Sequence, residues 1–149
     1  MSTTYQDFNR ALVKDIRAHG KATSGPFLGR DVLVLTTKGA KSGDVRETPL
    51  VYTRDGNHYV IVASKGGAPT HPSWYHNLVK HRGAEIEVGT EKFKVRATAL
   101  PKGPERDRLY EAHGETFAAF KDYPRKTTRV IPIVVLERVP PSTRRDVTA

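Results

Sequence analysis

The stretch DVLVLTTKGAKSGDVRETPLVYTRDGNHYVIVASKGG, residues 31–67, decides the fold class of this chain. Apolar residues cluster in it at strand-like spacing, between loops rich in glycine and lysine. The predicted strands are residues 31–37, 45–54 and 57–63. The pair Asp55-Gly56 is a strong hairpin signal between the second and third strands. Pro49 removes a backbone donor, so the second strand is expected at a sheet edge or with a bulge. We therefore expect three strands in meander order.

The rest of the chain predicts three helices and three more strands. The helices are expected at Tyr5–His19, at about 72–81 with Thr70 as its cap, and at 101–120. Gly114 weakens the third helix and is a candidate break in it. The further strands are expected at residues 85–88, 92–100 and 131–139. Hairpins predominate in this order, which favours an α+β fold with a small antiparallel barrel or half-barrel of about six strands and flanking helices.

The length and composition indicate one globular domain. At 149 residues the chain has the commonest single-domain size, and it needs no disulfide or metal to stabilise a core. We divide it into an N-terminal amphipathic helix and loop (1–30), a barrel domain (31–139) and a flexible tail (140–149). No apolar run approaches a membrane span and no signal-peptide pattern begins the chain, so a cytoplasmic protein is expected.

Charge and cysteine content restrict the function classes. Lysine and arginine exceed the acidic residues by nine, which predicts an anionic partner such as a phosphate- or carboxylate-bearing molecule, a membrane surface or nucleic acid. The chain has no cysteine, which excludes disulfides, iron–sulfur clusters, thiolate zinc sites and a cysteine nucleophile. Its six histidines have no metal-binding spacing, and no G-x-S-x-G elbow indicates a serine hydrolase. We predict no metal site.

Two glycine-rich loops carry the residues best suited to bind an anion. The first, 36–43 with Arg46 after it, combines lysines, hydroxyls and turning backbone amides, although it lacks the helix and the Gly-Lys-Ser/Thr of a P-loop. Its alternative interpretation is an ordinary basic hairpin loop. The second, 64–67, leaves a strand and leads into the helix that bears Trp74, which is suited either to stack on a planar ring or to fill the core.

A group of aromatic residues near the end of the third helix is a further candidate. Phe117, Phe120 and Tyr123 precede the basic segment 125–129. Aromatic side chains at a helix end either line a substrate pocket or belong to the core or an interface. The sequence leaves both interpretations open.

Three segments taken together resemble a known family. They are TTKGAKSGDVRETPLVY (36–52), DGNHYVIVASKGGAPTHPSWYHNL (55–78) and RVIPIVVLERV (129–139). In this order they resemble the deazaflavin-dependent nitroreductases, actinobacterial reductases that use reduced coenzyme F420 and include quinone reductases. The resemblance covers roughly residues 32–139. It implies a split β-barrel related to flavin-binding reductases.

The resemblance also implies a cofactor and a set of site residues. The cofactor is a deazaflavin with a phosphate and a polyglutamate tail, a polyanion that suits the positive charge of the chain. The implied cofactor-binding residues are Lys38, Lys41, Ser42, Gly43, Arg46, Pro49, Val62, Ala63, Lys65, Trp74 and Asn77. Ser64 and Tyr123 are the implied catalytic residues, and Phe117 and Phe120 the implied substrate pocket.

The implied reaction is hydride transfer from reduced coenzyme F420 to a small acceptor. Relatives that reduce nitroimidazoles carry several tyrosines where this chain has Phe117 and Phe120, and only Tyr123 keeps a hydroxyl. Fewer hydroxyl donors favour quinones or other conjugated, electron-poor carbonyl compounds as acceptors, with nitro compounds as a further possibility.

Several alternatives stay open at this point. An FMN-dependent reductase of the same fold and a non-enzymatic protein that binds a cofactor or lipid are the two competing functions. The basic residues are spread along the chain with no nucleic-acid module, so no nucleic-acid partner is expected. The amphipathic helix, with Leu12, Val13 and Ile16 opposite its basic face, either contacts the inner face of an anionic membrane or packs on the barrel. The oligomeric state is not predicted.

Overall fold

A computed structural model describes residues 5–25 and 27–140, with side chains from Phe8 onward. The helices are α1 (Tyr5–His19), α2 (Ser73–Lys80) and α3 (Pro104–Thr116), with short 3₁₀ turns η1 (Lys65–Gly67), η2 (Ala118–Lys121) and η3 (Tyr123–Arg125). The strands are β1 (Val32–Lys38), β2 (Val45–Val51), β3 (Thr53–Asp55), β4 (His58–Val62), β5 (Gly83–Val88), β6 (Glu91–Leu100) and β7 (Ile133–Arg138). The predicted tail lies, from residue 141 on, outside the described residues.

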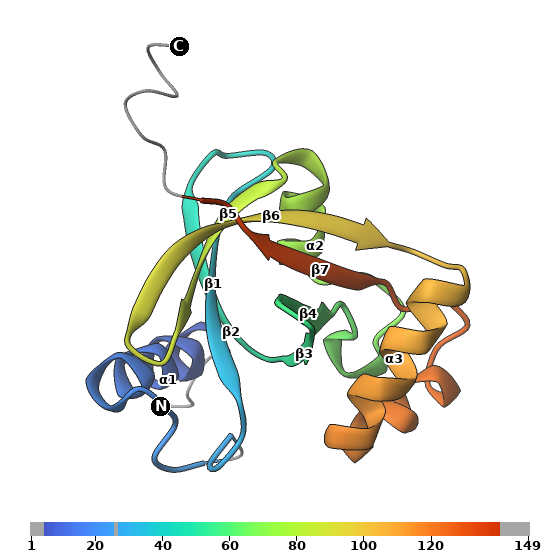
Figure 1. Ribbon diagram of the computed structural model, residues 1–149, viewed down its shortest axis with the longest axis horizontal. Coiled ribbons are helices and arrows are strands. Elements are labelled where there is room, and N and C mark those ends of the chain that lie inside the picture. The colour runs from blue at the N-terminus through green and yellow to red at the C-terminus, as the bar shows by residue number, and fades with distance from the viewer. Residues whose placement is uncertain (1–4, 26, 141–149) are drawn as a thin grey trace.

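The strands form one sheet in the order β2-β1-β5-β6-β7-β4-β3, and every neighbouring pair is antiparallel. The sheet curls into a half-barrel (Figure 1). This confirms the predicted α+β class and antiparallel barrel-like architecture. The sheet has seven strands where about six were expected, because the predicted strand 45–54 is two strands that meet at Tyr52.

The predicted three-strand meander is wrong. β2 pairs with β1 at one edge of the sheet, whereas β3 pairs with β4 at the opposite edge. Tyr52 is the one residue between them, and its N–H still donates to Asp31 O of the β1 side at 3.1 Å. The chain therefore passes from one edge strand directly into the other. Pro49 lies in the edge strand β2, which confirms its predicted place and leaves no ladder donor missing inside the sheet.

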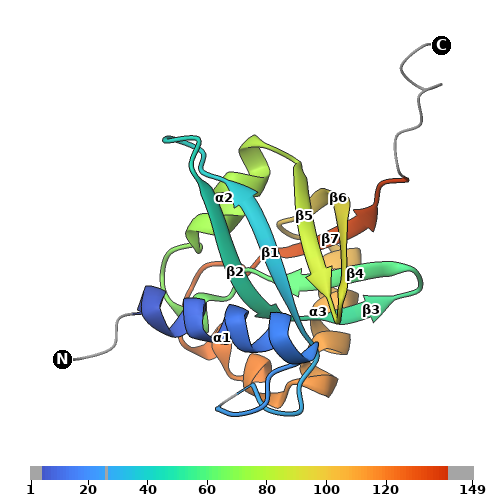
Figure 2. The same ribbon diagram turned by 90° about the vertical axis from the view of Figure 1, so that its left-hand side faces the viewer.

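Helix α1 packs across β1 and β2 (Figure 2). Its apolar side chains Leu12, Val13 and Ile16 are buried against Val32 and Val34. Burial of that stripe stabilises the helix far more than its intrinsic propensity does. The expectation that α1 packs on its own barrel is thus confirmed, and the face that the membrane hypothesis would use is covered by the sheet.

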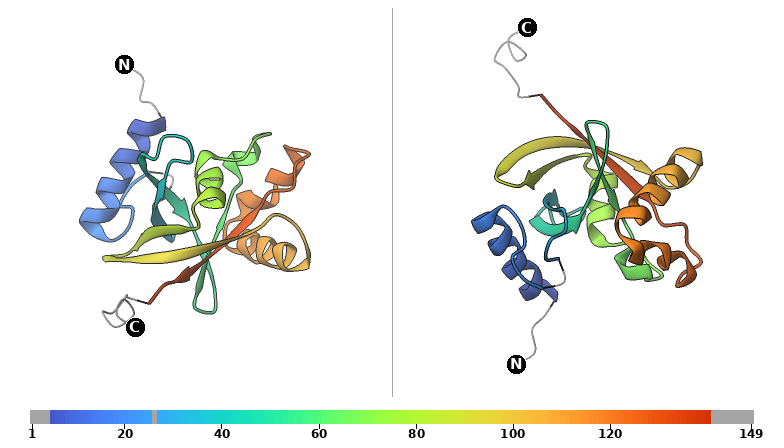
Figure 3. Two further views of the ribbon diagram at one scale, coloured as in Figure 1. Left: turned by 90° about the horizontal axis from the view of Figure 1, so that it is seen from above. Right: turned by 60° about the horizontal axis from the view of Figure 1, so that its bottom comes forward.

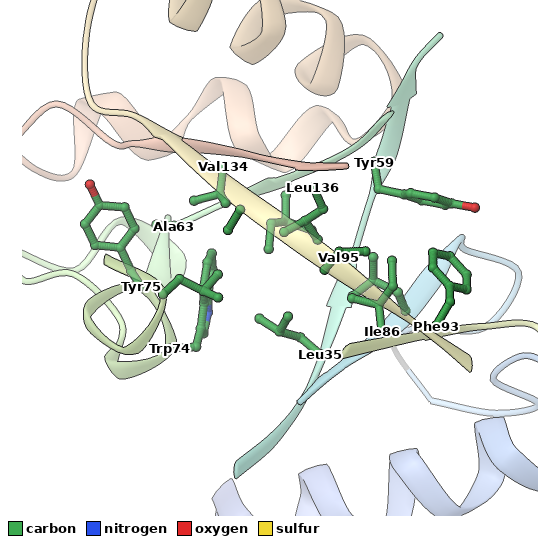
Figure 4. Close-up of a cluster of buried hydrophobic side chains, with 14 residues drawn as sticks. Leu35, Tyr59, Ala63, Trp74, Tyr75, Ile86, Phe93, Val95, Val134 and Leu136 are labelled. Atoms are coloured by element: carbon green, nitrogen blue, oxygen red, sulfur yellow. The ribbon is translucent and has the colours of Figure 1, made fainter. Parts of the chain in front are cut away.

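The main core lies inside the curl of the sheet. Trp74 faces the cluster from α2, and Tyr75 lies at its edge on the same helix (Figure 4). Trp74 is 6% exposed, so the interpretation of this tryptophan as a core residue holds. Its placement also anchors α2 beside the loop that joins β1 and β2.

Helix α3 lies on the opposite side of the molecule from α1 (Figures 1 and 3). It begins at Pro104 and ends at Thr116 before two 3₁₀ turns, so the predicted helix 101–120 is too long at both ends. Gly114 lies inside α3 and does not break it. Thr70 does not cap α2, because the N-cap of that helix is Pro72. The Thr70 hydroxyl instead accepts a hydrogen bond from Lys65 Nζ at 3.3 Å.

Within the described residues, no helix is both long enough and apolar enough to cross a membrane. Nor does any group of three or more His, Asp or Glu side chains come together there in a way that would hold a metal ion.

Candidate cofactor and substrate site

A large groove opens between α1, the β1–β2 loop and the first turns of α2. Its volume is about 1340 Å³, which exceeds the usual range for a drug-sized ligand and suits a large, extended cofactor. Of the residues predicted from sequence, it brings together Lys41, Ser42, Arg46, Trp74 and Asn77. Helix α1 adds a row of residues that the sequence interpretation did not assign to the site: Asn9, Arg10, Val13, Lys14 and Arg17.

The groove is strongly cationic because most of its bases lack a neutralising carboxylate. Lys14, Lys41 and Arg46 form no ion pair with any described residue. A cluster of unpaired cations around a groove favours an anionic ligand, and its attraction weakens as salt is added. The basic face of α1 could be seen in the sequence. Only the fold shows that this face lines the groove.

Arg17 plays a different part from the unpaired bases. Its guanidinium donates to Glu87 at 2.6 and 2.8 Å and to Glu47 at 2.5 Å. The hydrogen bonds with Glu87, and to a lesser extent those with Glu47, raise the pKa of Arg17. The hydrogen bonds from Arg17 in turn lower the pKa of the Glu87 carboxyl. Arg17 therefore fastens α1 to β2 and β5, which fixes the wall of the groove that carries Lys14.

The β1–β2 loop is held in shape by the protein itself. Asn77 Oδ1 accepts a hydrogen bond from the N–H of Ala40 at 2.9 Å, and Asn77 Nδ2 donates to Thr37 Oγ1 at 3.2 Å. Ser42 Oγ accepts from the N–H of Asp44 at 3.1 Å. Asn77 is buried and its amide is engaged on both sides, so it positions the loop against α2 rather than offering free donors.

The second group of predicted residues lies where β4 ends. Ala63 and Ser64 are buried, and the chain then enters the left-handed region at Lys65, with φ of 47°. Gly66 and Gly67 continue in that region, with φ of 65° and 85°. A non-glycine residue at such a φ is strained, and strain of this kind concentrates at functional sites.

Gly67 is required for the close approach of two loops. A Cβ at Gly67 would lie 2.9 Å from Lys126 Cβ and 3.3 Å from the carbonyl oxygen of Tyr123. The turn that follows Ser64 therefore packs directly on η3. This contact brings the predicted catalytic segments around Ser64 and Tyr123 side by side.

Arg129 fastens the loop that follows β4, and the sequence interpretation missed it. Its guanidinium donates to the carbonyl oxygens of Ser64 (2.8 Å), Ala68 (2.8 Å) and Ala63 (3.2 Å). It also contacts His71 Nδ1 at 2.9 Å. Burial lowers the pKa of Arg129. The sequence signal was a lone arginine before the last strand, whose role depends on a contact across more than sixty positions.

The aromatic candidates form a packed cluster in the segment that follows α3. Phe117 is buried, and its ring centroid lies 6.2 Å from that of Phe120, which lies 4.9 Å from Tyr123. Both phenylalanines also contact the buried ring of His113. Burial lowers the pKa of His113 to about 4, so this imidazole is neutral near pH 7.

The structure thus separates the predicted site residues into two groups. Those outside the lining of the cationic groove are Lys38, Gly43, Pro49, Val62, Ala63, Ser64, Lys65, Phe117, Phe120 and Tyr123. Trp74 belongs to both regions, because it lines the groove and shares a hydrophobic cluster with Ala63. A ligand that spans both groups would pass Trp74.

Comparison with known proteins gives a consistent result. The profile of the F420H(2)-dependent quinone reductases matches residues 8–138. An F420H(2)-dependent quinone reductase of Mycobacterium tuberculosis (strain ATCC 25618 / H37Rv) is 46% identical over 108 residues, which cover 71% of this chain and 72% of that protein.

Two solved structures have a similar fold. The structure of an F420-H2 dependent reductase, FDR-A, superposes with a TM-score of 0.66 at 36% identity, and covers 72% of this chain and 95% of its own. A domain-swapped dimer superposes with a TM-score of 0.68 at 33% identity, and covers 90% of this chain and 100% of its own. With this match over nearly the whole sequence, the split-barrel-like sheet and the cationic groove beside Trp74, the chain belongs to the F420H(2)-dependent quinone reductase family.

Proposed function

We propose that this chain reduces quinones with reduced coenzyme F420, and that the cationic groove holds the anionic part of the cofactor. The observation that carries the proposal is the set of bases Lys14, Lys41 and Arg46, which face one groove without carboxylate partners among the described residues. Coenzyme F420 carries a phosphate and carboxylates, so these residues suit it. The family uses reduced coenzyme F420, which leaves the FMN alternative without support.

The chemistry belongs to the cofactor. When bound, reduced coenzyme F420 supplies a hydride, which is two electrons and one proton; the quinone takes these up with one further proton and becomes the hydroquinone. The protein has to bind both molecules, exclude water and stabilise the negative charge that develops on the quinone oxygen.

We assign cofactor binding to residues that line the groove and to predicted residues that lie outside its lining. Lys41 and Arg46 pair with phosphate and carboxylate oxygens, and Ser42 shapes the loop that carries them. Lys38 is exposed beside this loop and adds positive charge. Gly43, Pro49, Val62, Ala63 and Lys65 are proposed to border the cofactor as the family resemblance implies.

We assign the reacting end of the site to the segments around Ser64 and Tyr123. Each offers a hydroxyl near the loop contact described above, suited to hydrogen-bond a substrate oxygen or deliver a proton. Phe117 and Phe120 lie on the α3 side of this region and present no hydroxyl. This composition favours a flat quinone or another conjugated, electron-poor carbonyl compound over a nitro compound.

The deciding experiment follows the oxidation of reduced coenzyme F420 by the purified protein with menadione as acceptor. A parallel reaction contains NADPH and FMN in place of the deazaflavin. We expect turnover with the deazaflavin alone. Absence of both turnover and F420 binding would contradict the proposal and favour a non-enzymatic binding protein.

Membrane contact and a cytoplasmic location stay predictions. The buried stripe of α1 is unavailable for membrane contact, but Phe8 of α1 and Leu28 of the loop after it are exposed, 37% and 60% respectively. Co-sedimentation with anionic liposomes at low salt tests this contact. Recovery of the protein entirely in the supernatant would contradict it.

A further inference from the structure

We propose that Arg129 is a positioning residue of the site: it orients and polarises, from behind, the backbone N–H groups of Ser64 and Lys65 as an oxyanion site. The ligand is an oxygen that carries or gains negative charge: the quinone oxygen or a carbonyl oxygen of the cofactor ring. The identity of the ligand rests on the proposed function, whereas the donor geometry does not.

The backbone conformation supplies the first observation. Ser64 is right-handed, with φ of −81° and ψ of −37°, and Lys65 is left-handed, with φ of 47°. Successive residues of opposite hand form a nest, in which neighbouring N–H groups converge on one point and bind an anion. Lys65 accepts an unfavourable conformation to complete this arrangement.

The contacts of Arg129 supply a second, independent observation. Its two terminal nitrogens bind the carbonyl oxygens of Ala63 and Ser64, at 3.2 and 2.8 Å. No described peptide bond is cis, so each carbonyl points opposite to the N–H of the next residue. With both carbonyls turned toward Arg129, the N–H groups of Ser64 and Lys65 point away from it together.

The two N–H groups are also without acceptors. On either side of the segment 64–66, the N–H groups of Ala63 and Gly67 donate to Pro132 O and Ser64 O, at 3.0 and 2.9 Å. Neither Ser64 nor Lys65 donates its N–H to any acceptor in the described part of the chain. Ser64 is 7% exposed, and a buried N–H without an acceptor is costly unless a ligand fills the position.

The charge of Arg129 gives the donors their preference for an anion. Among described residues it has no carboxylate partner, and its acceptors are the neutral carbonyls and His71 Nδ1. A cation bound to a peptide carbonyl polarises that peptide and strengthens its N–H as a donor. The negative charge that a quinone oxygen gains on hydride transfer is therefore stabilised by two polarised donors and one uncompensated cation.

The direct test observes the two amides by NMR of ¹⁵N-labelled full-length protein. One arm adds 4-nitrophenolate, an aromatic oxyanion, with neutral 4-nitroanisole as its control; the other adds oxidised coenzyme F420. We expect the Ser64 and Lys65 amide protons to move downfield. A shift with the phenolate alone assigns the site to the acceptor oxygen, and a shift with F420 assigns it to a cofactor carbonyl. No shift of either amide in either arm would overturn the proposal.

Variants test the part played by Arg129. Arg129→Met should move both amide resonances upfield before any ligand is added, weaken 4-nitrophenolate binding about tenfold and lower kcat by a similar factor. Arg129→Lys should recover only part of the effect, because an ammonium cannot hold two carbonyls in a fixed fork. The control is Arg106→Met, since Arg106 also donates to a backbone carbonyl, Ile131 O at 2.9 Å, but makes no hydrogen bond to Ala63 or Ser64.

The outcomes separate this inference from the proposed function. If the wild type oxidises reduced coenzyme F420 with menadione but the two amides respond to neither probe, the oxyanion site is wrong and the reductase stands. If the amides bind the phenolate and no turnover occurs, the oxyanion site stands and the reductase assignment is wrong. Equal amide and binding changes in Arg129→Met and Arg106→Met would reduce Arg129 to a general structural role and contradict its positioning role.

Discussion

The side-chain oxygen of Asn77 on α2 accepts a hydrogen bond from the backbone N–H of Ala40 at 2.9 Å, across 37 positions of sequence. This contact sets the β1–β2 loop, and with it Lys41, against the groove. Asn77→Ala leaves Ala40 N–H and Thr37 Oγ1 without their partner, so we expect a loss of about 1–3 kcal/mol in unfolding free energy. Cofactor affinity should also fall, because the loop loses its fixed position. Denaturant unfolding and an F420 titration measure the two effects; unchanged values for both would contradict the role given to Asn77.

The unpaired bases of the groove should act on binding more than on turnover. Lys41→Ala and Arg46→Ala each remove a charge-assisted contact, so we expect the Kd for F420 to rise about tenfold or more and kcat to change little. The effect should shrink at high salt, because these bases are exposed. Fluorescence titration of F420 measures it.

A matched control for the groove variants is Lys92→Ala, because Lys92 pairs with Glu85 on the β5–β6 hairpin instead of lining the groove. It should bind F420 like the wild type. Normal affinity in the Lys41→Ala/Arg46→Ala double variant would show that the phosphate-binding assignment is wrong.

The hydroxyls at the reacting end should act mainly on turnover. Ser64→Ala and Tyr123→Phe each remove a donor near the developing charge, and we expect kcat with menadione to fall about tenfold while the Kd for F420 stays within a factor of about two. Stopped-flow oxidation of reduced coenzyme F420 separates the two quantities. Tyr110→Phe is the control: it loses the hydrogen bond to Phe120 O and about 1 kcal/mol of stability, with turnover preserved. An effect on F420 affinity alone would move Ser64 or Tyr123 into the binding group.

The buried histidine of α3 makes stability depend on pH. The pKa of His113 falls from 6.5 to about 4 in the folded chain, because burial disfavours the charged ring. The unfolded chain takes up this proton at higher pH than the folded chain. The free energy of unfolding therefore keeps its full value above about pH 6.5. It falls by about 3 kcal/mol in all as the pH drops toward 4.

Urea unfolding between pH 7 and pH 4 checks this prediction. His113→Gln should flatten the acid slope, although it loses stability at neutral pH because Thr53 Oγ1 contacts His113 Nδ1 at 3.0 Å. The matched control His81→Gln should keep the slope of the wild type. An identical acid slope in His113→Gln would exclude His113 as its source.

The local features of the fold could be predicted from the sequence because they depend on neighbouring residues. The helix at Tyr5–His19, the hairpin at Asp55-Gly56 and the edge position of Pro49 all follow from spacing and backbone chemistry. The order of the strands does not. Nothing in the run 45–54 indicates that Tyr52 divides it between opposite edges of the sheet, since both halves have strand-like patterns.

The candidate site divides in the same way. Lys41 and Ser42 lie in a loop whose composition, with Arg46 just after it, already suggested an anion site, and the structure brings all three to one groove. Arg129 and the α1 bases act on residues far away in sequence, so spacing carries no information about their targets. Family resemblance supplied Ser64, but the pairing of its loop with Arg129 required the fold.

The direct passage from β2 through Tyr52 into β3 restricts how this chain can change over evolution or in design. The register of β2 on β1 and that of β3 on β4 are both fixed by residue-to-residue pairing, with a single position between them. One inserted residue would turn the side chains of a whole strand to the other face or force a bulge. Changes in length should therefore be confined to the β1–β2 loop, the Asp55-Gly56 turn and the segments outside the sheet. The spacing between the edge strands β2 and β3 should stay constant while the loops diverge.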